Sequence, residues 1–171
     1  MFDRLFDIIL QFLDLFRFWE VVDQYERGIV LRLGKFQREL DPGVHLLIPF
    51  GVDRAIKDNV VPRTMNLGAQ SLTTADGVQV VIGVVVTARI HDIQKSILEV
   101  ETVDEAVVDA CYAETASVVH GHTWEQLQAG DIDEKLRQAC RKRAWSYGVE
   151  IMRTQISDLS RCRSLRLWTQ S

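Results

Sequence analysis

The sequence predicts an α+β domain, because runs with the two-residue period of strands come first and runs with the longer period of helices follow. A long apolar row from Val78 to Ile90 alternates with a second set of side chains, as expected for a central strand. The period changes beyond Asp92, and a last strand-like run follows Gly148. We therefore expect a mainly antiparallel sheet with packed helices, preceded by an N-terminal amphipathic helix.

The composition limits the class of protein. A chain of 171 residues accommodates one domain with a short appendage, and 47% hydrophobic with 26% charged residues favours a stable core over global disorder. The formal net charge of −4 argues against nucleic acid as a partner. The three cysteines form no CxxC pair, which indicates reduced thiols. A lipidated surface thiol is the alternative.

The N-terminal helix is predicted over residues 2–19, which contain neither Gly nor Pro. At 100° per residue its polar side chains fall within an arc of about 140°, and apolar side chains fill the rest. The apolar residues that we expect to contact a membrane are Phe2, Leu5, Phe6, Ile9, Phe12, Leu13, Phe16 and Trp19. This helix has a broad apolar face and a narrow polar one.

The polar side chains of such a helix determine whether it spans a bilayer or lies flat in the interface. Eighteen residues reach about 27 Å, close to the hydrocarbon thickness of about 30 Å. Asp7 and Asp14 would then lie within the bilayer, at a cost of about 2.5–3.5 kcal/mol each near its centre. A single helix is therefore expected to lie flat in the interface. A ring of copies could bury the stripes, and a helix that packs on the domain or at a subunit seam is the alternative.

Two short strand runs follow the helix. Apolar residues alternate with polar or small ones from Ile29 to Leu33 and again from Val44 to Phe50. Asp41-Pro42-Gly43 between them predicts a turn, with Pro42 presetting φ and Gly43 accepting the positive φ of a type II turn. Residues 52–67 are predicted to form an irregular strand that bends or reaches a sheet edge at Val61-Pro62.

The second half alternates between turn and helix signals. Thr74-Ala75-Asp76-Gly77 predicts a tight turn before the long central strand. Helices are expected over 92–100, over 103–120 and from 131 to about 147, with Gly148 as the C′ residue of the last. Thr123 and Gln126 have capping-box spacing. The face of the second helix is predicted to comprise Val103, Val107, Ala110, Cys111 and Val118, and a final strand is predicted over 149–159.

Several motifs occur in a familiar order: QYERG, an LG turn, a PG…PF segment, SLTTADGVQVVIGVVVTARIHD and VEIMRTQISDL. Together they resemble the stomatin/prohibitin/flotillin (SPFH, band 7) family over residues 20–160. The resemblance implies an SPFH/band 7 domain, an N-terminal membrane-associating segment at 1–19, and a short tail at 161–171, which could form a few helical turns. It also places the protein at the cytoplasmic face of a membrane.

The resemblance implies a scaffold that self-assembles at the bilayer and organises lipids or membrane proteins, including a membrane protease whose activity it regulates. The expected partners are the lipid bilayer, further copies of the chain and an integral membrane protein. The long C-terminal coiled coil of the family is missing from this sequence, so we expect smaller or more labile oligomers. A second membrane contact is expected at Leu47, Ile48, Pro49 and Phe50.

The sequence gives no indication of an enzyme, a cofactor or a metal site. His120 and His122 follow a helix, where a spacing of two does not bring both side chains to one face. HExxH, paired-cysteine, phosphate-loop and GxSxG patterns do not occur. The alternatives to a scaffold are a module whose N-terminal helix docks on a partner protein, and a modulator that blocks the assembly of longer relatives. A small hydrolase would need a catalytic constellation that the sequence does not display.

Overall fold

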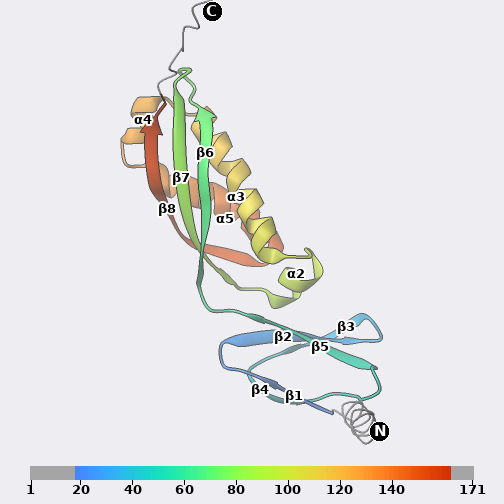
Figure 1. Cartoon of the computed structure of the whole chain (residues 1–171). Helices are drawn as coiled ribbons and strands as arrows, with labels where there is room; N and C mark the ends of the chain where they lie inside the picture. The colour runs from blue at the N-terminus through green and yellow to red at the C-terminus, as the bar shows by residue number, and fades with distance from the viewer. Residues whose placement is uncertain (1–17, 163–171) are drawn as a thin grey trace, which may run out of the picture.

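The computed structural model describes residues 18–162, in which strands precede helices as predicted (Figure 1). The strands are β1 (Trp19–Val22), β2 (Glu26–Arg32), β3 (Lys35–Leu40), β4 (Gly43–Leu46), β5 (Asp53–Asn59), β6 (Arg63–Thr73), β7 (Gln79–Ile90) and β8 (Val149–Arg161). The helices are α2 (Ile93–Leu98), α3 (Val103–His120), α4 (Trp124–Gln128), α5 (Ile132–Ala144) and the 3₁₀ turn η1 (Trp145–Tyr147). All strand pairs are antiparallel, so the α+β prediction is confirmed.

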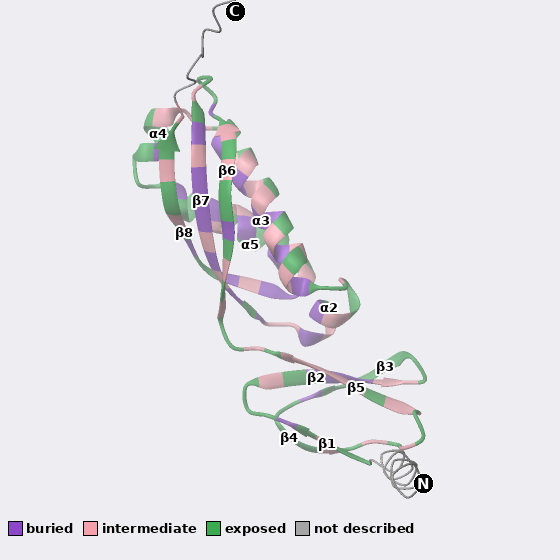
Figure 2. Cartoon of the chain, in the orientation of Figure 1, coloured by how far each residue is buried: buried purple, intermediate pink, exposed green. Residues whose placement is uncertain are grey.

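The described chain forms two lobes. The helix lobe, residues 63–162, contains the sheet β6-β7-β8 with α3 and α5 packed on it, and β7 is the central strand as predicted (Figure 1). Along β7 the row from Val80 to Ile90 is buried beneath the helices (Figure 2). The helices contribute the complementary faces, since the buried positions of α5 recur every four residues. The lobe therefore has a continuous apolar core.

The strand lobe, residues 18–59, stacks two small sheets. One is β3-β2-β5 and the other is β1-β4. β2 is buried on both faces, with Ile29 in the core of the helix lobe and Val30 in a smaller core with Val22 and Leu40. The order of layers is therefore the helix lobe, then β3-β2-β5, then β1-β4. This order leaves β1 and β4 at the end of the molecule farthest from the helices (Figure 1).

The predicted capping box and helix end are observed, whereas the turn at Gly43 differs from the prediction. The capping box of Thr123 and Gln126 is present, and Gly148 ends the last helical segment with φ of 73°. Gly43 has φ of 137°, well beyond the value of about 80° that a type II turn requires. The reason is that β3 and β4, on either side of this turn, belong to different sheets. Pro62 marks a bend, where the chain passes from β5 to β6 and so between lobes.

One sequence prediction about a side chain is wrong and another is incomplete. On α3, Val118 packs partly buried against the main core as predicted, but Val119, which was not predicted, is fully buried. Leu33 was expected within an alternating strand, yet it lies at the β2–β3 turn with φ of 50° and is 77% exposed. The final strand also runs further than predicted, to Arg161.

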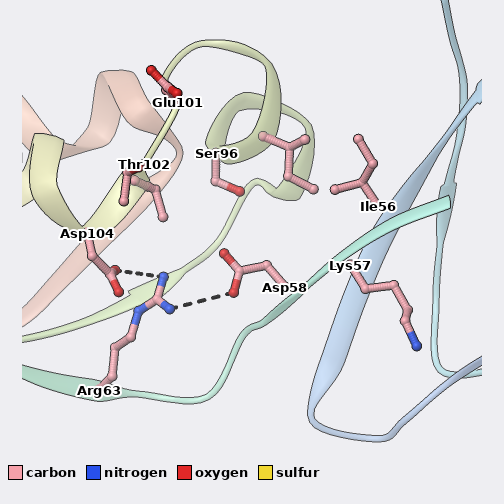
Figure 3. Close-up of a pocket in the computed structure, with 10 residues that line it drawn as sticks. Ile56, Lys57, Asp58, Arg63, Ser96, Glu101, Thr102 and Asp104 are labelled. Carbon is pink, nitrogen blue, oxygen red and sulfur yellow. Dashed lines mark ion pairs between the residues drawn. The ribbon is translucent and has the colours of Figure 1, made fainter. Parts of the chain in front are cut away.

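The two lobes meet at Arg63, the first residue of β6. Its guanidinium lies 2.9 Å from an Asp104 carboxylate oxygen of α3 and 3.6 Å from one of Asp58 in β5 (Figure 3). These residues line a cavity of about 290 Å³. Burial raises the pKa of Asp104, an effect that Arg63 opposes. Arg63 thus joins Asp104 within the helix lobe to Asp58 of the strand lobe.

Candidate functional site

The sheet β1-β4 exposes apolar side chains on its outer face. The register places Trp19 opposite Leu46 and Val21 opposite Val44, and directly opposite residues point to the same side of a sheet. Trp19 and Val21 are each 50% exposed, Val44 is 71% exposed and Leu46 is 72% exposed. Polar residues normally occupy the solvent side of such a strand pair. Here the exposed side is apolar instead.

Neighbouring residues extend this surface. Phe18 packs edge-on against Trp19 with ring centroids 4.6 Å apart, and the Leu47 amide donates to the Phe18 carbonyl at 2.9 Å. Ile48 and Phe50, which follow β4, are exposed as well. We call the whole surface the apolar face; it comprises Phe18, Trp19, Val21, Val44, Leu46, Ile48 and Phe50. Contiguous exposed apolar surface of this kind marks a site of contact with a protein or a membrane.

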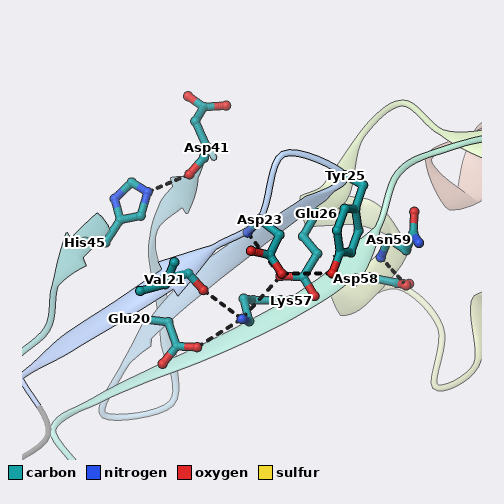
Figure 4. Close-up of polar contacts among 10 residues, drawn as sticks. All are labelled: Glu20, Val21, Asp23, Tyr25, Glu26, Asp41, His45, Lys57, Asp58 and Asn59. Carbon is teal, nitrogen blue, oxygen red and sulfur yellow. Dashed lines mark hydrogen bonds and ion pairs between the residues drawn. The ribbon is translucent and has the colours of Figure 1, made fainter. Parts of the chain in front are cut away.

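The inner side of the same sheet is held by a partly buried lysine. Lys57 of β5 donates to the Val21 carbonyl at 2.8 Å and forms ion pairs with Glu20 at 3.1 Å and Glu26 at 3.2 Å (Figure 4). The hydrogen bond to Glu20 is the main cause that raises the pKa of Lys57. These contacts join β1 to the sheet behind it, and Val22 packs beside them in the small core.

A second cationic anchor holds β4. Arg38 of β3 donates to the Leu46 carbonyl at 3.0 Å, and a second guanidinium nitrogen lies 3.3 Å from Nδ1 of His45. His45 in turn donates from Nε2 to the Asp41 carbonyl at 2.6 Å. Both strands of the outer sheet are thus fixed from behind by polar contacts. Their apolar side chains are consequently presented outward on a supported backbone.

The loop after β4 is anchored by Asp53. Its carboxylate accepts bonds from Arg32 at 2.8 Å and 3.1 Å and from the Ile48 amide at 2.9 Å. The bond from Arg32, followed by that from Ile48, lowers the pKa of Asp53. The carboxylate therefore stays ionised at neutral pH. It fixes the position at which Ile48 and Phe50 leave the sheet.

The predicted site residues fall into three groups. Phe2, Leu5, Phe6, Ile9, Phe12, Leu13 and Phe16 lie outside the described residues. Trp19 was predicted to lie in the N-terminal helix, but it is the first residue of β1, where pairing with Leu46 fixes it in a strand. Of the second predicted contact, Ile48 and Phe50 are exposed, whereas Leu47 packs against the small core.

Sequence reasoning missed Val21, Val44 and Leu46 as site residues. No strand was predicted at Val21, which lies in β1. The alternation from Val44 predicted a strand but did not indicate which of its faces would be buried. The direction depends on side chains of other strands, because Lys57 of β5 and Arg38 of β3 hold the opposite side. One signal was available in the sequence: each strand has a polar residue between two apolar ones. These polar residues are Glu20 and His45, which lie opposite each other in the register, so the apolar residues share the other face.

The described residues contain neither a metal-binding cluster nor a membrane-spanning helix. Among residues 18–162 no group of three metal-binding side chains comes together. In the same range no helix has both the length and the apolar character needed to cross a bilayer. His122 donates from Nδ1 to the Val118 carbonyl at 2.7 Å and its Nε2 lies 3.2 Å from Nζ of Lys135, so its ring is part of the local packing of α3.

Comparison with known proteins identifies the domain. An uncharacterised protein of Methanocaldococcus jannaschii is 27% identical over 141 residues, covering 81% of this chain and 70% of the relative. Stomatin-like protein 3 of Homo sapiens is 26% identical over 144 residues, covering 82% of this chain and 49% of the relative. A stomatin homologue of Pyrococcus horikoshii is 25% identical over 142 residues, covering 82% and 53%.

The chain thus spans about half the length of the two stomatin-like relatives. The family described as SPFH domain / Band 7 matches residues 20–166, which include both lobes. The match begins one residue after the start of β1 and continues past the end of β8. The chain therefore belongs to the SPFH domain / Band 7 family.

Proposed function

We propose that the protein is a membrane-bound scaffold whose strand lobe contacts the bilayer through the apolar face. The observation that carries the proposal is the outward direction of Trp19, Val21, Val44 and Leu46 on a sheet anchored from behind. The similarity to stomatin-like proteins supports it. In this account the protein organises lipids or membrane proteins at the cytoplasmic face and does not carry out catalysis.

The apolar contact supplies the binding energy in this proposal. Fully burying one large apolar side chain contributes about 1.5–3 kcal/mol, so a few partly inserted residues give a modest affinity per copy. Electrostatics adds little, since residues 18–59 contain seven acidic and six basic residues. Binding should therefore depend only weakly on anionic lipid. Several copies acting together convert modest attachment into firm attachment.

Phe18 and Trp19, which belong to the apolar face, follow residues 2–17 directly in the sequence. We propose that residues 2–17, the part of the predicted amphipathic helix that precedes Phe18, lie in the same interface and add their apolar side chains to the contact. The expected partners are thus the bilayer, further copies of the chain and an integral membrane protein or membrane protease. A module that binds a soluble partner protein through the same face is the rival function.

A charged pair on the apolar face tests the proposal. We expect Val44→Asp with Leu46→Asp to lower the fraction of the full chain that sediments with zwitterionic vesicles at least tenfold. Both side chains are more than two-thirds exposed, so the fold should be retained and the unfolding midpoint should change little. Gln37→Asp with Ser71→Asp adds the same charge at exposed positions outside the face and should sediment like the wild type.

Unchanged sedimentation of the Val44/Leu46 variant would show that the apolar face does not contact the bilayer. If the wild type itself fails to sediment with vesicles, the face serves a protein partner and the rival function replaces the scaffold. Vesicles with and without anionic lipid separate apolar from electrostatic attachment, because only electrostatic attachment requires the anionic lipid. Raising the salt concentration is a second test, since salt screens only the electrostatic contribution.

A further inference from the structure

Two of the three cysteines are buried together in the helix lobe. Cys111 lies on α3 and Cys140 lies on α5, and neither side chain is exposed to solvent. Both belong to the main apolar core, and the two helices pack directly against each other (Figure 1). Both cysteines are free thiols in this structure. The interface between α3 and α5 therefore encloses a pair of nucleophilic groups.

The two thiols contact each other, although they are far apart in the sequence. A hydrogen bond joins the side chains of Cys111 and Cys140, and this bond, followed by burial, raises the pKa of Cys111. The neighbouring interior positions of the two helices are small: Ala110 precedes Cys111, and Ala144 lies one turn after Cys140. Small side chains here allow the helices to approach closely. The fold thus brings the two sulfur atoms together.

The third cysteine lies in a different environment. Cys162 follows the last residue of β8, and its backbone amide donates to the Gln79 carbonyl at 2.9 Å. Its side chain is only partly buried. Cys162 therefore serves as an internal reference, because a thiol reagent in solution reaches it without any opening of the core.

A cavity of about 460 Å³ lies at the same helix interface. Its lining includes Glu114 of α3 with Ala139 and Lys142 of α5. Ala139 is next to Cys140 in the sequence, and the charge of Glu114 adds a smaller contribution to the raised pKa of Cys111. The cavity therefore brings solvent close to the buried thiols. Because a raised pKa lowers the thiolate fraction, any reaction of this pair at neutral pH is slow.

We infer that Cys111 and Cys140 are a reversible redox site, at which exchange with a small-molecule disulfide joins α3 to α5. In the first step one cysteine thiolate attacks the small disulfide, whose S–S bond breaks and releases one small thiol. The second cysteine then attacks the mixed disulfide, forms the bond between the two cysteines and releases the second small thiol. The two cysteine protons end on the released thiols, and two electrons pass from the protein to the reactant.

The folded chain should favour this bond over the unfolded chain. It already holds the two sulfurs in contact, whereas the unfolded chain must close the loop between them at a cost in conformational entropy. Any such preference raises the folding equilibrium constant of the oxidised chain by the same factor, because the two equilibria form one thermodynamic cycle. The stability of the helix lobe thus depends on the redox conditions around the protein, independently of the proposed membrane contact.

Glutathione buffers measure this preference. The full chain carrying Cys162→Ser is equilibrated with reduced and oxidised glutathione, starting from the reduced and from the oxidised protein, and its remaining thiols are then alkylated in denaturant. Trypsin leaves Cys111 in peptide 96–135 and Cys140 in peptide 138–141, so mass spectrometry of the unreduced digest identifies the linked pair. We expect the ratio [GSH]²/[GSSG] at half-oxidation to be at least about tenfold higher for the folded chain than for the chain in urea.

Urea unfolding measures the other side of the cycle. The oxidised Cys162→Ser chain should unfold at a higher urea concentration than the reduced chain. The matched control adds Cys140→Ala, which leaves Cys111 as the single cysteine, and should unfold at the same urea concentration in both buffers. The glutathione measurement does not use this control, so it tests the inference even if the control folds poorly.

Three results would overturn the inference. The first is a half-oxidation ratio no higher in the folded chain than in urea, and the second is equal unfolding midpoints for the oxidised and reduced chains. The third is a wild-type chain in which Cys162 carries glutathione while Cys111 and Cys140 are both alkylated, because the oxidant was then active and the buried pair did not respond.

Discussion

Replacing Val84 by aspartate is expected to abolish cooperative folding of the helix lobe. Val84 is 1% exposed at the middle of β7, the central strand, and lies in the main apolar core. A carboxylate there would be desolvated without a cationic partner, at a cost of more than about 4 kcal/mol. Domains of this size have total stabilities of about 5–15 kcal/mol. Circular dichroism during thermal unfolding measures the effect.

The control for this change lies on the same strand. Gln79→Asp introduces the same charge at the exposed first residue of β7 and should alter the unfolding free energy by less than about 0.5 kcal/mol. A Val84→Asp variant that melts at the wild-type temperature would mean that β7 does not occupy the centre of the core.

Gly148→Ala is expected to destabilise the protein by about 3 kcal/mol. Gly148 has φ of 73°, a conformation that costs an L-residue about 1–2 kcal/mol. A Cβ at this position would also lie 2.4 Å from the Asp92 carbonyl oxygen. The backbone cannot retreat freely, because the amides of His91 and Asp92 both donate to the Gly148 carbonyl. Urea unfolding of the variant measures the loss.

Gly130→Ala separates the two causes. Gly130 has φ of 81°, but a Cβ there meets nothing within 4 Å. Its replacement should therefore cost only the conformational part, about 1 kcal/mol. Equal losses at the two positions would show that the crowding at Asp92 is absent in solution.

The elements of the helix lobe could be predicted because their signals are local. The apolar row of β7 has the two-residue period, α3 was predicted with its observed bounds, and Gly148 ends the last helical segment as expected. No local sequence pattern predicts the contacts between the lobes. Arg63 joins Asp58 and Asp104, which are separated along the chain, and neither the spacing nor the residue types specify that pairing.

The candidate site was only partly predictable for the same reason. The run from Val44 to Phe50 indicated a strand, and Ile48 with Phe50 was expected to contact a membrane. The sequence could not establish that Val44 and Leu46 also point outward, because a strand may bury either face. That choice depends on Lys57 and Arg38, which anchor the inner side from other strands.

The proposed function depends on the contact of Trp19 with the bilayer, and quenching of its fluorescence by brominated lipids measures that contact. The full chain carrying Trp124→Phe, Trp145→Phe and Trp168→Phe retains Trp19 as its single tryptophan. We expect a blue-shifted Trp19 emission on binding zwitterionic vesicles, with strong quenching by lipids brominated near the headgroup. Vesicle binding with unshifted and unquenched Trp19 emission would contradict it.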